Sequence, residues 1–416
     1  MADNFYFEDE NAENTPPETL KEEQKMNNVE KNSYDENMNN VDAATKNVNN
    51  NNFVNNHQNY YNVAQNQQYQ PYYQPNYYSY QPSYQPFFNQ YYQSPEQMKL
   101  HFEKNQVKKT ANFIGIGIIL FFAFNFVFSY ILGAFLKTEE AINFIMDPAV
   151  TLELNVVLSV LGFGISSIFI LKAQRVKASE LISYGPPKKG VTFAAIIAAV
   201  GFCYTANIAV TLLQSKFQSF LPFAQPQLEY PEGIAGFALS VIAIAVVPAL
   251  IEEFLFRSVI MGSLLKYGKA FAIFTSSMLF ALIHGNLVQI PFAFLVGLVI
   301  GAMVVETNSI WTGVIIHFIN NFISVCMDYL SRGMDEGLIT VIYLFLMAFL
   351  MIIGILGFYL LSIKNKKLFS YDETDHKSTS MQRFGWFSGS ASIIVFFSIT
   401  FLEILAMQLS SVMNIM

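Results

Sequence analysis

Two glutamates and an arginine lie inside an apolar stretch, VVPALIEEFLFR, at residues 246–257. Ionisable groups at membrane depth are costly, so by default they mark a functional site and face the protein interior. Helical geometry separates their roles, because Glu253 and Arg257 share a face at i and i+4 whereas Glu252 projects about 100° away from Glu253. We therefore predict a buried ion pair between Glu253 and Arg257, which leaves Glu252 available for chemistry.

Further polar groups with catalytic potential occur in later apolar segments. His284 lies in FALIHGN, where Phe280 precedes it by about one helical turn and could orient its ring. His317 and Asn321 lie in HFINN and share a helix face at i and i+4. Counted at about 1.5 Å per residue from the nearest polar turns, Glu252, His284 and Asn321 each lie roughly 20 Å deep. We expect these groups, carried by separate helices, to converge.

This set contains the groups that hydrolysis of an amide by activated water requires. Glu252 can serve as the general base for a water molecule that His284 holds from its other side. His317 and Asn321 can donate hydrogen bonds to the oxyanion that forms when a carbonyl is attacked. The scheme needs no serine or cysteine nucleophile.

Other kinds of site could use the same residues. One carboxylate and two imidazoles, those of Glu252, His284 and His317, also suit a divalent metal such as zinc. The close-spaced HExxH motif is absent, so spacing alone does not choose between a metal and a glutamate-activated water. A proton relay in a carrier would also place Glu and His deep in a helix bundle, although the two halves of the chain show no internal repeat.

The elements that must position these groups are membrane-spanning helices. The chain has 416 residues, of which 53% are hydrophobic and 13% charged, and the apolar residues are clustered in long blocks. Such blocks predict an all-α, polytopic transmembrane helix bundle of about eight or nine spans. The blocks cover approximately 112–135, 150–171, 192–214, 235–265, 270–287, 289–305, 310–330, 338–363 and 385–413. The fifth and sixth are short, and we expect them to be irregular or to sit deep in the protein.

The N-terminal quarter of the chain has a different composition. Residues 1–108 contain no apolar block, and from about 48 to 94 they form an Asn/Gln/Tyr/Pro-rich tract. Such a composition cannot bury enough apolar surface to offset the entropy of ordering, so we predict a disordered low-complexity tail, which could recruit a protein partner. We divide the rest into N-terminal transmembrane helices (109–233), a catalytic core (234–332) and C-terminal transmembrane helices (333–416).

Charge predicts the orientation of the chain and excludes one class of partner. Lys and Arg concentrate in every second connecting segment, at 99–109, 172–189, 266–269 and 364–383. The positive-inside rule makes these segments and the tail cytoplasmic, and nine spans would place the C-terminus on the opposite side. The net charge is -7 and no basic surface is evident, so we expect no nucleic-acid partner. Cys203 and Cys326 each lie in an apolar block and suggest packing rather than a disulfide or a zinc site.

The motifs also carry a family resemblance. EEFLFR (252–257), FALIH (280–284) and HFINN (317–321) match EExxxR, FxxxH and HxxxN in the order typical of the CPBP family of intramembrane proteases. The chain resembles this family over roughly residues 235–330. The family includes type II CAAX prenyl endopeptidases and bacterial relatives linked to bacteriocin processing, bacteriocin immunity and lysostaphin resistance. The resemblance implies that Glu252 and His284 activate water while His317 and Asn321 form the oxyanion site, and it leaves the metallo and carboxylate mechanisms open.

Together these features predict a CAAX-protease-like endopeptidase in the lipid bilayer, acting on a membrane-associated peptide or protein. The Asn-rich composition is compatible with a bacterial plasma membrane. A carboxylate mechanism requires no cofactor, whereas a metallo mechanism would use a divalent ion such as zinc. The alternative is a non-proteolytic membrane protein, such as an immunity factor, a scaffold or a proton-coupled carrier, that keeps these groups for binding.

Overall fold

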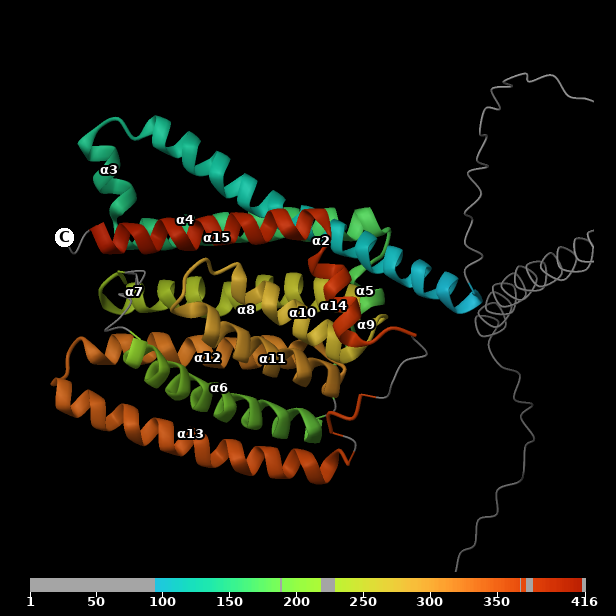
Figure 1. Ribbon diagram of the computed structural model, residues 1–416. Helices are drawn as coiled ribbons and strands as arrows, with labels where there is room; N and C mark the ends of the chain where they lie inside the picture. Colours follow the sequence, from blue (N-terminus) through green and yellow to red (C-terminus); the bar gives the residue numbers. More distant parts are fainter. Residues whose placement is uncertain (1–93, 188, 218–228, 367, 372–376, 414–416) are drawn as a thin grey trace, which may run out of the picture. The chain divides into compact units, whose positions relative to one another are not determined.

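The computed structural model describes residues 94–187, 189–217, 229–366, 368–371 and 377–413, and in these ranges it contains helices and no strand. The expected disorder of residues 1–93 lies outside the described residues. The helices form a bundle (Figure 1). Their bounds are α2 (Pro95–Phe135), α3 (Glu139–Met146), α4 (Pro148–Gln174), α5 (Ala178–Leu181), α6 (Lys189–Phe217), α7 (Gly233–Ser240), α8 (Val247–Glu253), α9 (Gly262–Leu265), α10 (Lys269–Leu282), α11 (Gln289–Thr307), α12 (Ile310–Ser331), α13 (Glu336–Lys364), α14 (Ser380–Ser388) and α15 (Ala391–Met413).

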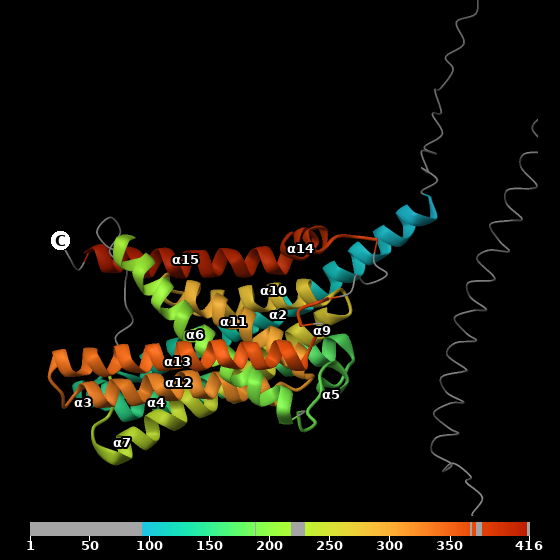
Figure 2. The same ribbon diagram turned by 90° about the horizontal axis from the view of Figure 1, so that it is seen from below.

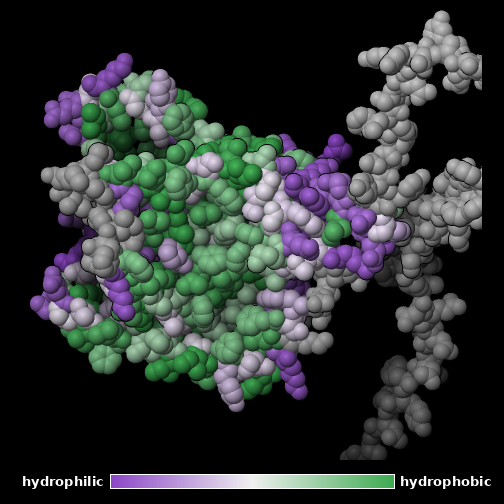
Figure 3. Space-filling model, viewed as in Figure 1, coloured by the Kyte–Doolittle hydropathy of each residue, from purple (hydrophilic) through white to green (hydrophobic). Residues whose placement is uncertain are grey.

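The described helices confirm the prediction of a polytopic membrane protein. Eight helical segments in these ranges are long and apolar enough to cross a membrane, and α10 is a shorter apolar helix. The face seen in Figure 3 is hydrophobic across its middle, with hydrophilic residues gathered at both ends of the bundle. Apolar side chains on the outside of a bundle are stable only in a lipid environment. The chain is therefore an integral membrane protein.

The first helix begins earlier than the sequence predicted. We assigned residues 95–108 to the tail, whereas α2 starts at Pro95. Ser94 caps this helix, because its side chain accepts a hydrogen bond from the backbone N–H of Gln97 while the Gln97 side chain accepts one from the backbone N–H of Ser94. Proline at the first helical position is also favourable, since its missing N–H would have no partner there.

The basic connecting segments lie at one end of the bundle. Figure 1 places the start of α2, the short helices α5 and α9, and α14 at the same end, while the C-terminus lies at the other. The helices alternate in direction as the sequence predicts when α10 is counted as one pass. The assignment of that basic end to the cytoplasm stays a prediction.

The helix that carries the glutamates is one continuous span with two irregular segments. It runs through Gly233–Leu265 and includes the π-helical segments η1 (Val241–Val246) and η2 (Phe254–Met261) on either side of α8. Short π-helical segments in an α-helix are frequent at functional sites because they change the direction in which side chains point. Pro248, in the first turn of α8, contributes to the irregularity since it has no backbone N–H to donate.

Small residues set the closest helix contacts. A Cβ on Gly297 of α11 would lie 3.0 Å from Cβ of Ser277 on α10, so the GxxxG spacing at Gly297 and Gly301 serves a helix contact. Helices α6 and α13 meet at Gly201 and Gly354, where a Cβ on Gly201 would lie 2.4 Å from Cα of Gly354. Figure 2 shows α13 and α12 running along the bundle, with α15 at the opposite edge.

Candidate active site

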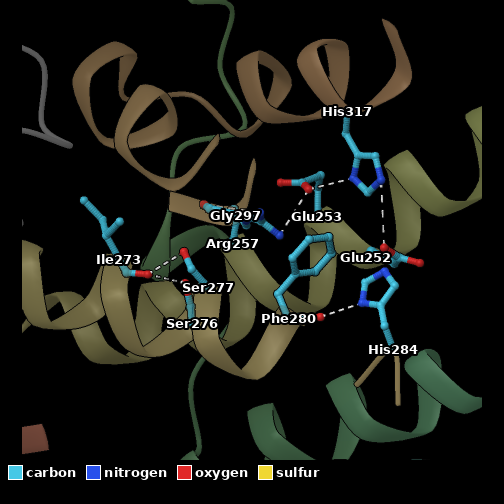
Figure 4. Close-up of polar contacts among 10 residues, drawn as sticks. All are labelled: Glu252, Glu253, Arg257, Ile273, Ser276, Ser277, Phe280, His284, Gly297 and His317. Carbon is cyan, nitrogen blue, oxygen red and sulfur yellow. Dashed lines mark hydrogen bonds and ion pairs between the residues drawn. The ribbon is translucent and has the colours of Figure 1, made fainter. Parts of the chain in front are cut away.

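The polar residues singled out in the sequence line one cavity. Its volume is about 660 Å³. The wall of this cavity contains Glu252 from α8, His284 from the turn after α10, and His317 and Asn321 from α12. In Figure 4, His317 and His284 lie on either side of the Glu252 carboxylate. The structure thus brings together all four residues that we proposed for catalysis.

Adjacent glutamates have different surroundings. Glu253 is fully buried and its Oε1 lies 3.2 Å from Nη1 of Arg257, which is also fully buried. The Glu252 side chain retains 17% of its exposure and reaches the cavity. The ion pair expected from the i, i+4 spacing is therefore present, and Glu252 remains on the cavity side.

Arg257 is held by contacts from two further helices. Its Nη2 donates a hydrogen bond of 3.4 Å to the backbone oxygen of Gly297 on α11. Its guanidinium carbon lies 4.4 Å from the centre of the Phe280 ring on α10, within cation–π distance. Arg257 therefore connects its own span, where it pairs with Glu253, to helices α10 and α11.

Glu253 also holds a catalytic candidate, a contact that sequence reasoning did not predict. His317 Nδ1 lies 2.9 Å from the same Oε1 of Glu253. A carboxylate oxygen only accepts hydrogen bonds, so we infer that the proton is on Nδ1 and that Nε2 faces the cavity. His317 Nε2 lies 3.9 Å from Oε2 of Glu252. Arg257, Glu253, His317 and Glu252 therefore form a connected row of charged and polar groups.

The position of His284 differs from the one that we expected. The sequence predicted a helix through this residue, whereas α10 ends at Leu282 and His284 lies in the turn that follows. Gly285 has φ of 66°, a left-handed conformation that glycine adopts without strain and that ends the helix. His284 Nδ1 lies 2.9 Å from the backbone oxygen of Phe280, so the ring donates through Nδ1 and Nε2 is free to accept a hydrogen bond.

Phe280 packs against both imidazoles, as the FALIH spacing suggested for one of them. Its ring makes edge-to-face contacts with His284, at 5.2 Å between ring centres, and with His317, at 5.9 Å. The same ring carries the guanidinium of Arg257 on its face. Phe280 therefore fixes the relative positions of three polar side chains without itself being polar.

Asn321 makes a hydrogen bond that depends on a proline in another helix. Its Nδ2 donates to the backbone oxygen of Ile244 at 2.9 Å. In an α-helix that oxygen would accept from the N–H of residue 248, and Pro248 has none. The second N–H of the Asn321 amide remains for another acceptor, since an amide nitrogen carries two donors. Pro248 is the signal in the sequence that could have predicted this contact.

A short helix leaves room for the cavity. Helix α10 has 14 residues, so the hairpin of α10 and α11 turns inside the bundle rather than at its surface. The remaining wall includes Leu152 near the start of α4, Tyr230 before α7 and Met407 near the end of α15. The start of α4, the start of α7 and the end of α15 lie at the end of the bundle opposite the basic segments (Figure 1). Because these lining residues lie near those helix ends, the cavity wall continues toward that end of the bundle.

The wall is rich in groups that can bind a peptide backbone. Side-chain amides and a hydroxyl line it, namely those of Asn155, Asn286, Gln289, Asn320, Asn321 and Ser324. Burial raises the pKa of the Tyr230 hydroxyl, and the negative charge of Asp328 adds to this, so the hydroxyl stays protonated. The cavity thus combines apolar walls with hydrogen-bond donors and acceptors.

The donor arrangement does not fit the metal site that we considered. Within the described ranges, no group of three or more His, Cys, Asp or Glu side chains is arranged to hold a metal ion. The bonds of His317 Nδ1 to Glu253 and of His284 Nδ1 to Phe280 leave Nε2 of each ring available, so the misfit lies in the grouping of the side chains and not in the imidazoles themselves. We therefore derive no step through a metal.

A comparison with known families agrees with the resemblance seen in the motifs. Residues 234–323 match the family model described as Rce1-like, type II CAAX prenyl endopeptidase Rce1-like. The matched segment runs from α7 into α12 and contains all four cavity residues proposed for catalysis. No curated protein and no solved structure matches the chain. The family indicates a protease, and the resemblance to CPBP proteases is confirmed over this segment.

Proposed function

Because residues 234–323 match a family of membrane endopeptidases, we propose that this protein hydrolyses a peptide bond of a membrane-associated peptide or protein inside the bilayer, using a carboxylate-activated water. The observation that supports the proposal is that the two adjacent glutamates make different contacts. Glu253 is engaged by Arg257 and His317, while Glu252 reaches the cavity between the two imidazoles.

Activation of water falls to Glu252 and His284. A water molecule between them can donate one hydrogen bond to the Glu252 carboxylate and one to Nε2 of His284, whose Nδ1 proton is already bonded to Phe280. Glu252 takes the first proton while the water oxygen attacks the carbonyl carbon of the peptide bond. The tetrahedral intermediate that results carries a negative oxygen.

Stabilisation of that oxygen falls to the helix that carries HFINN. Asn321 has one amide N–H left after its bond to Ile244, and this N–H donates in every protonation state. His317 donates from Nε2 when both of its ring nitrogens carry protons, since Nδ1 is already used by Glu253. As the intermediate collapses, the C–N bond breaks and Glu252 returns its proton to the leaving amine. The products are a free amine and a carboxylic acid, which releases its proton to solvent and becomes a carboxylate.

The experiment compares membrane-proteome termini from cells that express the wild type or Glu252→Gln. Gln keeps the size of the side chain and removes its basicity, so we expect a set of new termini with the wild type and none with the variant. Glu336→Gln, in the exposed first turn of α13, is the matched control and should behave as the wild type. Identical termini with wild type and Glu252→Gln, at equal protein abundance, would overturn the proposal and favour a non-proteolytic role.

A further inference from the structure

An unpaired carboxylate lies on a helix outside the family segment. Glu403 is the single charged residue of α15, about 18 Å along the helix axis from Ala391. It makes no hydrogen bond and no ion pair with any residue in the part of the chain that the structure describes. A charged group at this depth in a span is costly and, by default, has a function and a partner.

Glu403 lies against the turn that carries His284. A Cβ built on Gly285 would lie 3.3 Å from Oε2 of Glu403, so the carboxylate rests directly on the residue after His284. Met407, one helical turn further along α15, lines the catalytic cavity. Helix α15 stands at the edge of the bundle, as Figure 2 shows. Glu403 is therefore at the rim of the cavity, between α15 and the turn that joins α10 to α11.

The charge around this rim is negative and uncompensated. The residues that line the cavity include Glu252 and no Lys or Arg. The nearby cation, Arg257, is fully buried and its charge is matched by Glu253. A cation that pairs with Glu403 must therefore come from another molecule, and the molecule that enters this cavity in the proposed reaction is the substrate.

We propose that Glu403 binds a lysine or arginine side chain of the substrate as it enters between α15 and the α10–α11 turn, and so selects peptides with a basic residue close to the cleaved bond. The inference rests on the proposed function and adds a substrate class to it. Glu403 lies beside the turn that carries His284, and consecutive Cα atoms of a peptide are about 3.8 Å apart. A substrate lysine or arginine whose side chain binds Glu403 would therefore lie within a few residues of the peptide bond that is cleaved. Glu403 is thus a specificity residue and takes no part in the bond-breaking step.

The experiment uses the full-length protein in lipid vesicles and paired synthetic peptides with one apolar membrane segment. The peptides carry Lys or Gln at successive positions around the expected cleavage site. For wild type we expect one register at which the Lys peptide has at least a ~10-fold higher kcat/KM than the Gln peptide, mainly through KM. Glu403→Gln should abolish this preference and leave cleavage of the Gln peptide unchanged. Glu403→Arg should transfer the preference to a peptide with Glu at that register.

The outcomes separate this inference from the proposed function. Cleavage of Lys and Gln peptides with equal kcat/KM by the wild type, lost in Glu252→Gln, would overturn the role of Glu403 and leave the peptidase standing. Photo-crosslinking of the same peptides to the Glu252→Gln variant, which we expect to be inactive, measures peptide binding without cleavage. Equal crosslinking of Lys and Gln peptides at every register would also overturn the inference, whether or not any peptide is cleaved.

Discussion

The side chain of Asn321 donates a hydrogen bond of 2.9 Å to the backbone oxygen of Ile244, to which Pro248, four residues on, has no backbone N–H to donate. An asparagine on α12 thereby completes the backbone hydrogen bonding of the helix that carries Glu252. A free carbonyl inside a bilayer has no water to bond to, so such a group requires a partner from the protein. The same contact aims the second amide N–H of Asn321 for use in the cavity.

Removing this amide should therefore have two separable effects. Asn321→Ala removes the side-chain hydrogen bond to the Ile244 oxygen, which should lower the free energy of unfolding by about 0.5–1.5 kcal/mol. It also removes a donor to the oxyanion, which should lower kcat by about 10²- to 10³-fold. Thermal unfolding in detergent and cleavage of a peptide substrate measure the two effects.

A second substitution separates them. Pro248→Ala supplies a backbone N–H at the position from which an α-helix would bond to Ile244. The double variant Asn321→Ala with Pro248→Ala should recover thermal stability and remain inactive. Recovery of both properties would show that Asn321 serves only the backbone and has no part in catalysis.

The contact between α6 and α13 offers a test of packing away from the cavity. A Cβ on Gly354 would lie 2.6 Å from Cα of Gly201, a backbone atom that cannot move aside without separating the helices. Gly354→Ala should lower the free energy of unfolding by about 1–3 kcal/mol. Gly164→Ala is the matched control, because nothing lies within 4 Å of the new methyl group. Since alanine is the better helix former, the control should be neutral or stabilised by up to about 1 kcal/mol. Equal thermal stability of the two variants would contradict the close contact.

Sequence periodicity predicted those features of the site that lie within one helix. Glu253 and Arg257 are four residues apart on one span, so their pairing follows from helical geometry alone. The number of residues from the nearest polar turn, multiplied by the helical rise per residue, also predicted that Glu252, His284 and Asn321 would lie at a similar depth in the membrane. That argument uses only the rise per residue and holds for any packing of the spans.

Features that depend on how one helix is rotated against another could not be predicted in this way. The hydrogen bond between His317 and Glu253 joins residues 64 positions apart, and its existence depends on the relative rotation of α12 and α8. The π-helical segments change that rotation, and hydrophobic periodicity does not reveal them. The end of α10 at Leu282 was also missed, although Gly285 in FALIHGN is a typical signal for the end of a helix.

Removal of metal ions should leave activity intact. Glu252, His284 and His317 line one cavity, but the described residues do not form a metal-binding arrangement. We expect unchanged kcat/KM after treatment with a strong chelator and dialysis, and less than stoichiometric zinc by mass spectrometry. Loss of activity that returns with one equivalent of zinc per chain would contradict the carboxylate mechanism.

Arg257 should be needed for folding rather than for the chemical step. Arg257→Ala leaves Glu253 as a fully buried carboxylate without its cation, a change that typically costs about 3–5 kcal/mol of stability. We expect strongly reduced abundance in the membrane and a lower unfolding temperature. Because the cost comes from the unpaired charge, adding Glu253→Gln to Arg257→Ala should recover part of the lost stability.

The chain provides a matched control for this ion pair. Arg332 and Asp328 form another i, i+4 pair, with 2.7 Å between Nη2 and Oδ2, but their side chains are 35% and 37% exposed. Water screens such a pair, so Asp328→Ala, which removes the pair and keeps the contacts of Arg332 with Tyr230 and Tyr329, should cost about 1 kcal/mol or less. Similar losses of abundance for Arg257→Ala and Asp328→Ala would show that burial of the Glu253 carboxylate does not set the cost. The larger loss at Arg257 is expected because the Glu253 carboxylate, which also holds His317, has no water with which to replace the guanidinium.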